Sequence, residues 1–231
     1  MLSNMYFNGD EQLWNVFAAN NRYGKYDVLS TANNHSLDQG VDGLVSTIDF
    51  LEQRNIQHVG TARTKDEADQ PVIVERNGIK IGFVAATFSL NALQLEEGEK
   101  HYCHHYNLNE EHPHIAGIVE QAKRARAAGA EFIVGMLHMG CAYQPYPSQQ
   151  IINNMHRICE AAELDLVLGG HPHNVQPFEW HSYETLHGKK NTFIIYSQGD
   201  FIAYDIFKWC HLPLLLKFTL TAGMSNGHRV V

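Results

Sequence analysis

Three short apolar runs of this sequence, residues 26–31, 132–137 and 166–168, are each followed by side chains that can bind a metal ion or move a proton. If the runs are strands of one α/β fold, their carboxyl ends meet where ligands bind in open sheets. Neutral imidazoles and amide oxygens bind divalent ions such as Zn, Mn and Fe. The candidate ligands are Asn34 after the first run, His138 after the second, and His171 and His173 after the third.

The segment Gly169-Gly170-His171-Pro172-His173 can turn sharply near a ligand. Its two glycines permit close approach of the backbone to a bound group, and Pro172 stiffens the segment by fixing its own φ. In an extended segment the two histidines project the same way, whereas in a turned loop they can reach two neighbouring ions. Both geometries keep the pair in the site shared with the other two runs.

His35, next to Asn34, has a different expected role. If Asn34 offers its carbonyl oxygen to a metal, the imidazole of His35 can act as a general acid or an electrophile at the reacting group. A single histidine after a strand is more often a hydrogen-bonded loop residue, so the interpretation depends on the whole set. The set predicts a metal centre that handles phosphate or a related anion.

A second group of possible ligands lies in and just after the long polar connection 87–113. Loops of this length in folded domains are often functional or mobile. The spacing matches no closed structural zinc site. A flexible loop is therefore the favoured interpretation, and a cover over the site is the alternative. The group comprises His101, Cys103, His104, His105, His112 and His114.

The composition excludes several classes of function. With 231 residues, 44% hydrophobic and 18% charged, the sequence suits one domain over residues 1–231. A formal net charge of −8 argues against a nucleic-acid-binding surface. No apolar run approaches the ~18 residues that span a bilayer, and the start, Met1-Leu2-Ser3-Asn4, lacks a signal-peptide pattern. The four cysteines show no Cys-x-x-Cys pairing, which favours free thiols.

Strand-like and helix-like segments alternate along the chain, which predicts a layered α/β fold. Asn77-Gly78 between two apolar runs predicts a hairpin, so at least one strand pair is antiparallel. Ser148 is the predicted N-cap of one helix, and Gly129 ends another. The predicted strands are 26–31, 56–59, 71–75, 79–86, 132–137, 166–169, 178–181, 193–197 and 214–220, and the predicted helices are 41–54, 115–129 and 148–162.

Four groups of motifs together resemble the CapA/PgsA-type proteins of bacterial capsule and poly-γ-glutamate synthesis, whose fold is related to calcineurin-like metallophosphoesterases. The resemblance extends from about Tyr26 to Leu220, in order and spacing. The motifs are Asn33-Asn34-His35-Ser36-Leu37-Asp38-Gln39-Gly40 with Gly43-Leu44 and Thr47, His138-Met139-Gly140 with Tyr143 and Pro147, Gly170-His171-Pro172-His173 with Gln176-Pro177, and Tyr196-Ser197 with Gly199 and Phe201.

The resemblance implies an α/β fold of four layers (αββα), in which two mixed sheets lie face to face between helices. It also implies a site at the strand ends for one or two divalent ions of Mn, Fe or Zn. The implied metal ligands are Asn34, His138, His171 and His173, and the implied catalytic residues are His35, which protonates the leaving group, and Asp38, which supports His35 or the helix start.

The sequence also departs from the family pattern. Members open with an apolar strand ending in Gly-Asp, and a further acidic ligand precedes the Asn-Asn-His motif; a domain that lacks this N-terminal strand region is expected here. Gly9-Asp10 has the right letters but lies too near Asn34. Ala142 and Asp200 stand where members usually have an acidic residue and Asn. Without a bridging carboxylate, two close divalent cations repel, so one weakly held ion, or none, is expected.

Two functions of different classes remain open at this point. One is a capsule or poly-γ-glutamate biosynthesis protein with a metal-dependent, phosphoesterase-like hydrolase site, and the other is a non-catalytic assembly or polymer-binding subunit that retains the fold. A third is a sugar- or lipid-phosphate hydrolase unrelated to capsule. The expected partners are a phosphoester or polyglutamate substrate and other capsule-synthesis subunits, with no nucleic acid. The family suggests the cell envelope, with membrane association only through segments outside this sequence.

Overall fold

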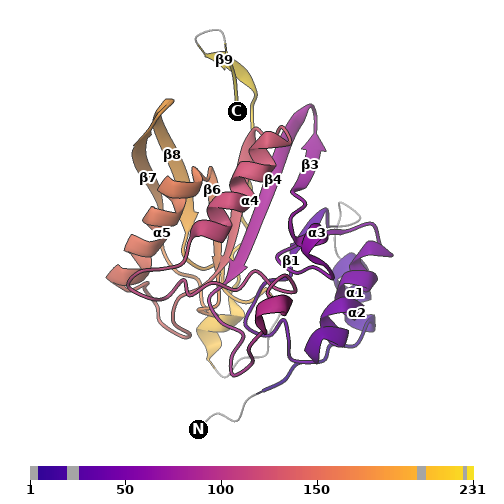
Figure 1. The fold of residues 1–231 in the computed structure, drawn as a ribbon. Helices are drawn as coiled ribbons and strands as arrows, with labels where there is room; N and C mark the ends of the chain where they lie inside the picture. Colours follow the sequence, from indigo (N-terminus) through magenta and orange to yellow (C-terminus); the bar gives the residue numbers. More distant parts are fainter. Residues whose placement is uncertain (1–4, 20–25, 202–206, 226–227) are drawn as a thin grey trace.

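A six-stranded mixed sheet with the order β3-β4-β5-β6-β8-β7 forms the centre of the structure (Figure 1). The computed structural model describes residues 5–19, 26–201, 207–225 and 228–231. Strands β4, β5, β6 and β8 are parallel neighbours, and β3 and β7 add antiparallel edges. The strands of this sheet are β3 (Val72–Arg76), β4 (Ile79–Thr87), β5 (Phe132–His138), β6 (Leu166–Gly170), β7 (Phe178–Thr185) and β8 (Gly188–Ile195).

The hairpin between β3 and β4 confirms the prediction from Asn77-Gly78. Both residues have positive φ, 52° and 74°, and the ladder closes directly beside them with Arg76 opposite Ile79. A two-residue turn with left-handed φ at both positions matches the twist of the strands it joins, which is why this dipeptide marks the turn so strongly.

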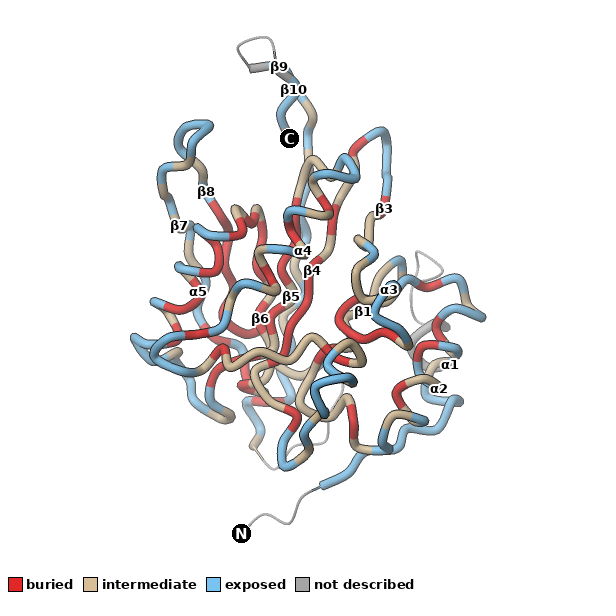
Figure 2. The backbone as a smooth tube through the Cα atoms, in the orientation of Figure 1, coloured by how far each residue is buried: buried red, intermediate tan, exposed pale blue. Residues whose placement is uncertain are grey.

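Helices α4 (Ala116–Ala127) and α5 (Gln149–Ala162) cover one face of the sheet (Figure 1). Ile118, Met155 and Ile158 are fully buried there against the apolar residues of the central strands, whose tubes are mostly red in Figure 2. The predicted helix ends are confirmed: Ser148 Oγ accepts a hydrogen bond from Ile151 N (3.3 Å), and Gly129 follows α4 with φ 94°. The contact between these helices and the sheet forms the largest hydrophobic cluster among the described residues.

A smaller layer lies beside the edge of the large sheet. Strands β1 (Val28–Ser30) and β2 (Gln57–Val59) pair in parallel, and α2 (Gly40–Glu52) packs on them through Leu44 and Ile48. These elements correspond to three segments predicted from periodicity. The shorter helices are α1 (Gln12–Ala19), α3 (Lys65–Ala68), η1 (Glu97–Glu99) and η2 (Lys208–His211), and a C-terminal hairpin consists of β9 (Gly223–Ser225) and β10 (His228–Val230).

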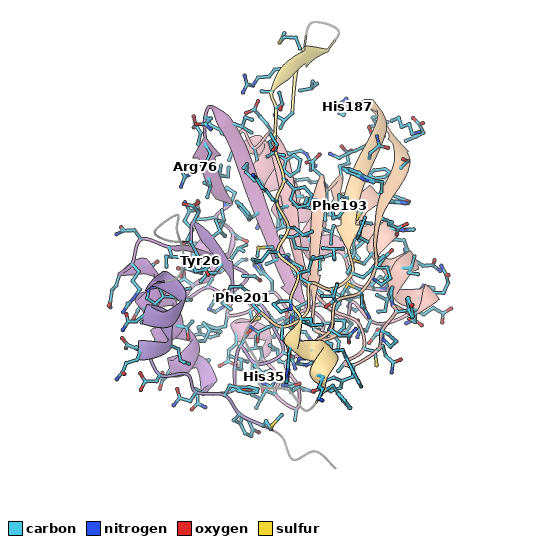
Figure 3. All side chains as sticks on the ribbon, turned by 180° about the vertical axis from the view of Figure 1, so that it is seen from behind. Tyr26, His35, Arg76, His187, Phe193 and Phe201 are labelled. Atoms are coloured by element: carbon cyan, nitrogen blue, oxygen red, sulfur yellow. The ribbon has the colours of Figure 1, made fainter. Side chains whose placement is uncertain are left out.

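The predicted strand at residues 214–220 is wrong. The segment runs extended over the second face of the large sheet (Figure 3), where Leu214 and Leu216 pack against Val134, Leu166 and other residues of the central strands. It belongs to no ladder among the described residues. Its apolar residues alternate because an extended segment that lies on the sheet face buries every second side chain. A half-buried strand has the same period of two.

The connection 87–113 is not the flexible loop that its polarity predicts. Leu90, Cys103 and Leu108 have at most 1% of their surface exposed, and Thr87 and Thr61 form isolated bridges with His105 and Cys103. Buried apolar side chains and backbone hydrogen bonds hold the segment in place. Its histidines form no shared cluster of three ligands with other His, Cys, Asp or Glu among the described residues.

The α/β fold class predicted from the sequence is confirmed. A central six-stranded sheet is flanked by helices, and β1 and β2 supply a second, smaller sheet. All four cysteines are free, as predicted. Across the ranges that the structure describes, no helix is both long and apolar enough to cross a membrane. The start of the chain at residues 1–4, where no signal pattern was found, lies outside those ranges.

Candidate functional site

The carboxyl ends of β1, β5 and β6 bring together the residues that we call the imidazole site: Asn34, His138, His171 and His173. Asn34 Oδ1 lies 2.8 Å from His138 Nε2, although 104 residues separate the two in the sequence. The rings of His138 and His171 have centroids 5.1 Å apart, and those of His171 and His173 are 6.0 Å apart at 50°. The predicted convergence of the three runs is present in the structure.

The glycines before His171 allow this convergence. A Cβ at Gly169 would lie 2.1 Å from the carbonyl oxygen of Tyr196, so no other residue fits beside the adjacent strand. His171 and His173 then both adopt positive φ, 99° and 68°. The loop is turned, so the extended arrangement considered from sequence is wrong. Non-glycine residues rarely occupy this region, and such positions concentrate at functional sites.

Aromatic rings and one carboxylate hold the two loop histidines. Phe88 meets the His171 ring edge-on at 4.6 Å, and Tyr143 stacks on His173 at 4.9 Å. Asp200 places both carboxylate oxygens 3.1 Å from Nδ1 of His173. Asp200, a residue that departs from the family pattern, therefore contacts a predicted ligand.

Burial and the neighbouring histidines keep His138 and His171 uncharged. Loss of solvent, and secondarily the neighbouring histidines, lower the pKa of His138 to about 3 and that of His171 to about 4. Nδ1 of His171 is buried without a hydrogen-bond partner. Neutral imidazoles with free lone pairs are the protonation state that metal ions bind.

His35 and Asp38 form a separate pair beside the imidazole site. His35 Nδ1 lies 2.8 Å from Asp38 Oδ2, and the same oxygen accepts the backbone N–H of Phe7 at 2.7 Å. The Asp38 side chain is only 4% exposed, whereas His35 is 29% exposed. A buried carboxylate thus orients an accessible imidazole, with Nδ1 directed at the carboxylate and Nε2 on the opposite edge of the ring.

The residues present fit one divalent ion better than two. Amide oxygen and imidazole nitrogen are suitable donors for Zn, Mn or Fe, and the orphaned His171 Nδ1 offers another. The nearby carboxylates are engaged: Asp38 with His35 and Asp200 with His173. Asp10, considered as a replacement ligand, instead accepts the N–H of Gln12 at 2.8 Å at the start of α1.

The sequence reasoning missed the residues that support the site. Asn91 donates to the backbone oxygen of Asn34 (2.7 Å) and accepts from its side chain (3.0 Å). Asn109 exchanges two hydrogen bonds with the backbone of Gly140, 2.6 and 2.9 Å long, just after β5. Both lie in the connection 87–113, where no local pattern marks them. Only their contacts across the fold reveal their role.

An unpredicted second group of possible ligands, which we call the acid cluster, consists of Asp49, Glu52, His58 and Glu67. The ligating atoms of Glu52, His58 and Glu67 lie within 4.8 Å of one another. Arg63 lies among them and bonds Asp49 at 2.8 Å, Glu52 at 3.1 Å and Glu67 at 2.9 Å. Arg63 therefore takes part in an ion-pair network with three carboxylates.

A six-stranded mixed sheet flanked by helices, with a smaller second sheet beside it, places the chain in the class of α/β sandwich proteins. The chain belongs to the family described as bacterial capsule synthesis protein PGA_cap, whose profile matches residues 5–205. It is 25% identical over 181 residues to a capsule biosynthesis protein CapA of Bacillus anthracis, covering 77% of this chain and 40% of that protein.

A second relative is a PGA biosynthesis protein CapA of Bacillus subtilis strain 168. It is 25% identical over 182 residues, which cover 77% of this chain and 42% of the relative. The chain thus spans about two fifths of the length of the curated relatives it matches. The family predicted from the motifs is confirmed.

Proposed function

We propose that this chain is a metal-dependent, phosphoesterase-like hydrolase domain that acts in the synthesis of a bacterial capsule polymer. The observation that carries the proposal is the 2.8 Å contact between Asn34 Oδ1 and His138 Nε2, which joins ligands from two sheets beside the uncharged His171. The names of the relatives support poly-γ-glutamate as the polymer. A substrate with a phosphoester or related acyl bond, and further capsule-synthesis subunits as partners, belong to the same proposal.

Asn34, His138, His171 and His173 would hold the ion. When bound, such an ion lowers the pKa of water and polarises a phosphoryl or acyl oxygen. His35 supplies the proton for the departing oxygen: Asp38 accepts a hydrogen bond from Nδ1–H of the imidazolium, which leaves the Nε2 proton for transfer. Phe7 contributes its ring edge-on to His35 at 4.6 Å and limits how the imidazole can turn.

The test compares metal content and turnover in one set of proteins. His35→Ala should abolish hydrolysis of a phosphodiester whose leaving group is an alkoxide, which needs a proton to depart, and leave the metal content of the purified protein unchanged. Asp38→Asn should lower turnover and shift its pH profile, because the imidazolium loses its carboxylate partner. Loss of metal in His35→Ala would contradict the role assigned to His35.

A non-catalytic, polymer-binding subunit is the second candidate, and a specific observation favours it. Both carboxylates near the site are already bonded to histidines, so few negative groups remain to offset a doubly charged ion. A wild-type protein that binds metal and polyglutamate but hydrolyses no phosphoester or acyl substrate would establish this candidate in place of the hydrolase.

A further inference from the structure

We propose that a cavity between β2, α3, β3 and α4 binds a small neutral polyhydroxylated ligand of about the size of a sugar. The cavity measures about 450 Å³, and Val72 and Phe83 contribute apolar walls. It shares no lining residue with Asn34, His35 or the histidines of the imidazole site. The two sites are therefore separate, and the proposal is independent of the hydrolase function.

Buried polar atoms without partners gather on this cavity. The described residues contain five buried side-chain N or O atoms that lack a hydrogen-bond partner, and three of them belong to residues that line it. Buried polar groups in folded proteins are nearly always paired, so each orphan needs an explanation. The three atoms are Nδ1 of His58, Nδ1 of His104 and Nε2 of Gln121.

Two of the orphans define what a ligand must offer. Gln121 Oε1 accepts the N–H of Ala85 at 3.1 Å, which leaves its NH₂ group as an unmet donor. His58 Nδ1 has no hydrogen-bond partner, and an imidazole nitrogen can donate or accept according to the tautomer. Polar contacts also reach His58 from Thr61 and Gln121 from Tyr106, but neither gives the orphaned atom hydrogen-bond geometry.

A hydroxyl group meets both demands, because it donates and accepts. An ammonium group cannot accept from Gln121. An anion would face the carboxylates of Glu52 and Glu67, and the cation that lines the cavity, Arg124, is already paired with Asp69 at 2.6 Å. Burial lowers the pKa of His58 and keeps the ring uncharged near neutral pH. A ligand with several hydroxyls and C–H faces fits a cavity that combines these polar atoms with Phe83.

The experiment measures binding of D-glucose and N-acetyl-D-glucosamine to the whole chain by saturation-transfer NMR. We expect transfer to at least one of the two sugars. Gln121→Leu should weaken that binding about tenfold, because it removes the donor. Gln149→Leu makes the same replacement at an exposed position of α5 and should leave binding unchanged.

His58→Phe provides a second variant that retains a flat ring and removes the orphaned Nδ1. It should reproduce the loss of sugar binding, with folding checked by circular dichroism and melting temperature. The proposal is overturned if the folded wild type binds neither sugar, if both folded variants bind as the wild type does, or if L-serine binds and the sugars do not. The last outcome would assign the cavity to a charged ligand.

Discussion

The imidazole site and the acid cluster both gather potential metal ligands, but they differ in how far their bonding capacity is already met. In the acid cluster, Arg63 bonds Asp49, Glu52 and Glu67, so a cation already lies among the carboxylates. In the imidazole site, burial lowers the pKa values of His138 and His171, and Nδ1 of His171 has no hydrogen-bond partner. Close ligand atoms alone therefore do not identify a metal site, and the imidazole site is the one that our proposal assigns to the ion.

The largest effect is expected from His138→Ala. The change removes the ligand that contacts Asn34 and should weaken divalent metal binding at least a hundredfold, about 2.7 kcal/mol. Calorimetric titration with Zn²⁺ or Mn²⁺ measures it. His187→Ala is the matched control, since His187 lies at the opposite end of the molecule from His35 (Figure 3).

If His138→Ala binds metal as tightly as the wild type, the metal is held elsewhere. Glu52→Gln then becomes the informative variant, because the ligating atoms of Glu52, His58 and Glu67 lie within 4.8 Å of one another. Loss of metal binding in Glu52→Gln would show that the acid cluster, and not the imidazole site, holds the metal.

Arg63→Met tests why the acid cluster should not bind a metal in the native protein. Removing the guanidinium leaves like charges together and should cost about 1–2 kcal/mol of unfolding free energy, measured by urea denaturation. It should also create a metal site, so that added Zn²⁺ restores stability in this variant but changes the wild-type cluster little. No rescue by Zn²⁺ would show that the cluster geometry itself is unsuitable.

The two regions should also respond to acid in different pH ranges. His138 and His171 have folded pKa values of about 3 and 4 against 6.5 unfolded, so the unfolded chain binds more protons in between. Metal-free protein should therefore lose roughly 2 kcal/mol for each of these two histidines between pH 7 and 5. The hydrogen bond from Arg63 lowers the pKa of Glu52, so the stability that this ion pair contributes is lost only as the pH falls below about 4.5, the ordinary value for a glutamate.

Urea unfolding of chelator-treated protein at pH 7, 6 and 5 measures this difference. The His138→Asn/His171→Asn variant should show a flatter pH dependence over that range, and Glu52→Gln should leave the slope unchanged. A wild-type slope that survives the double substitution would place the titration in other buried histidines, such as His104.

The smallest effect is expected from Asp200→Asn. The substitution keeps the contact with His173 Nδ1 and removes the charge, so metal affinity should fall severalfold rather than vanish. Zn²⁺ titration beside His138→Ala measures the ratio of the two effects. An effect of Asp200→Asn as large as that of His138→Ala would make Asp200 a direct ligand.

Local signals account for most of the fold that the sequence predicted. Asn77-Gly78 and the Ser148 cap depend on a few neighbouring residues, and both are confirmed. The strand predicted at 214–220 failed because periodicity cannot distinguish pairing in a ladder from packing across a sheet face. The prediction of a flexible loop at 87–113 is wrong because the segment is held by contacts such as the bridge between Thr61 and Cys103, which no local sequence pattern shows.

The part of the candidate site that lies in sequence motifs could be predicted. The motifs and the strand ends place Asn34 and His138 in one site, and the two side chains are in contact in the structure. Asn91 and Asn109 lie in irregular backbone, so their hydrogen bonds depend on the tertiary fold. Arg63 is a similar case, since its carboxylate partners come from two helices, α2 and α3.

The left-handed backbone at His171 and His173 bears on how this sequence can change over time. Such conformations cost about 1–3 kcal/mol at residues other than glycine. Glycine at either position would remove this cost and raise the stability of the fold. Selection for folding stability alone would therefore favour replacing both histidines. A variant selected only for thermostability is therefore expected to carry glycine at one or both positions, and each such change would remove an imidazole from the site.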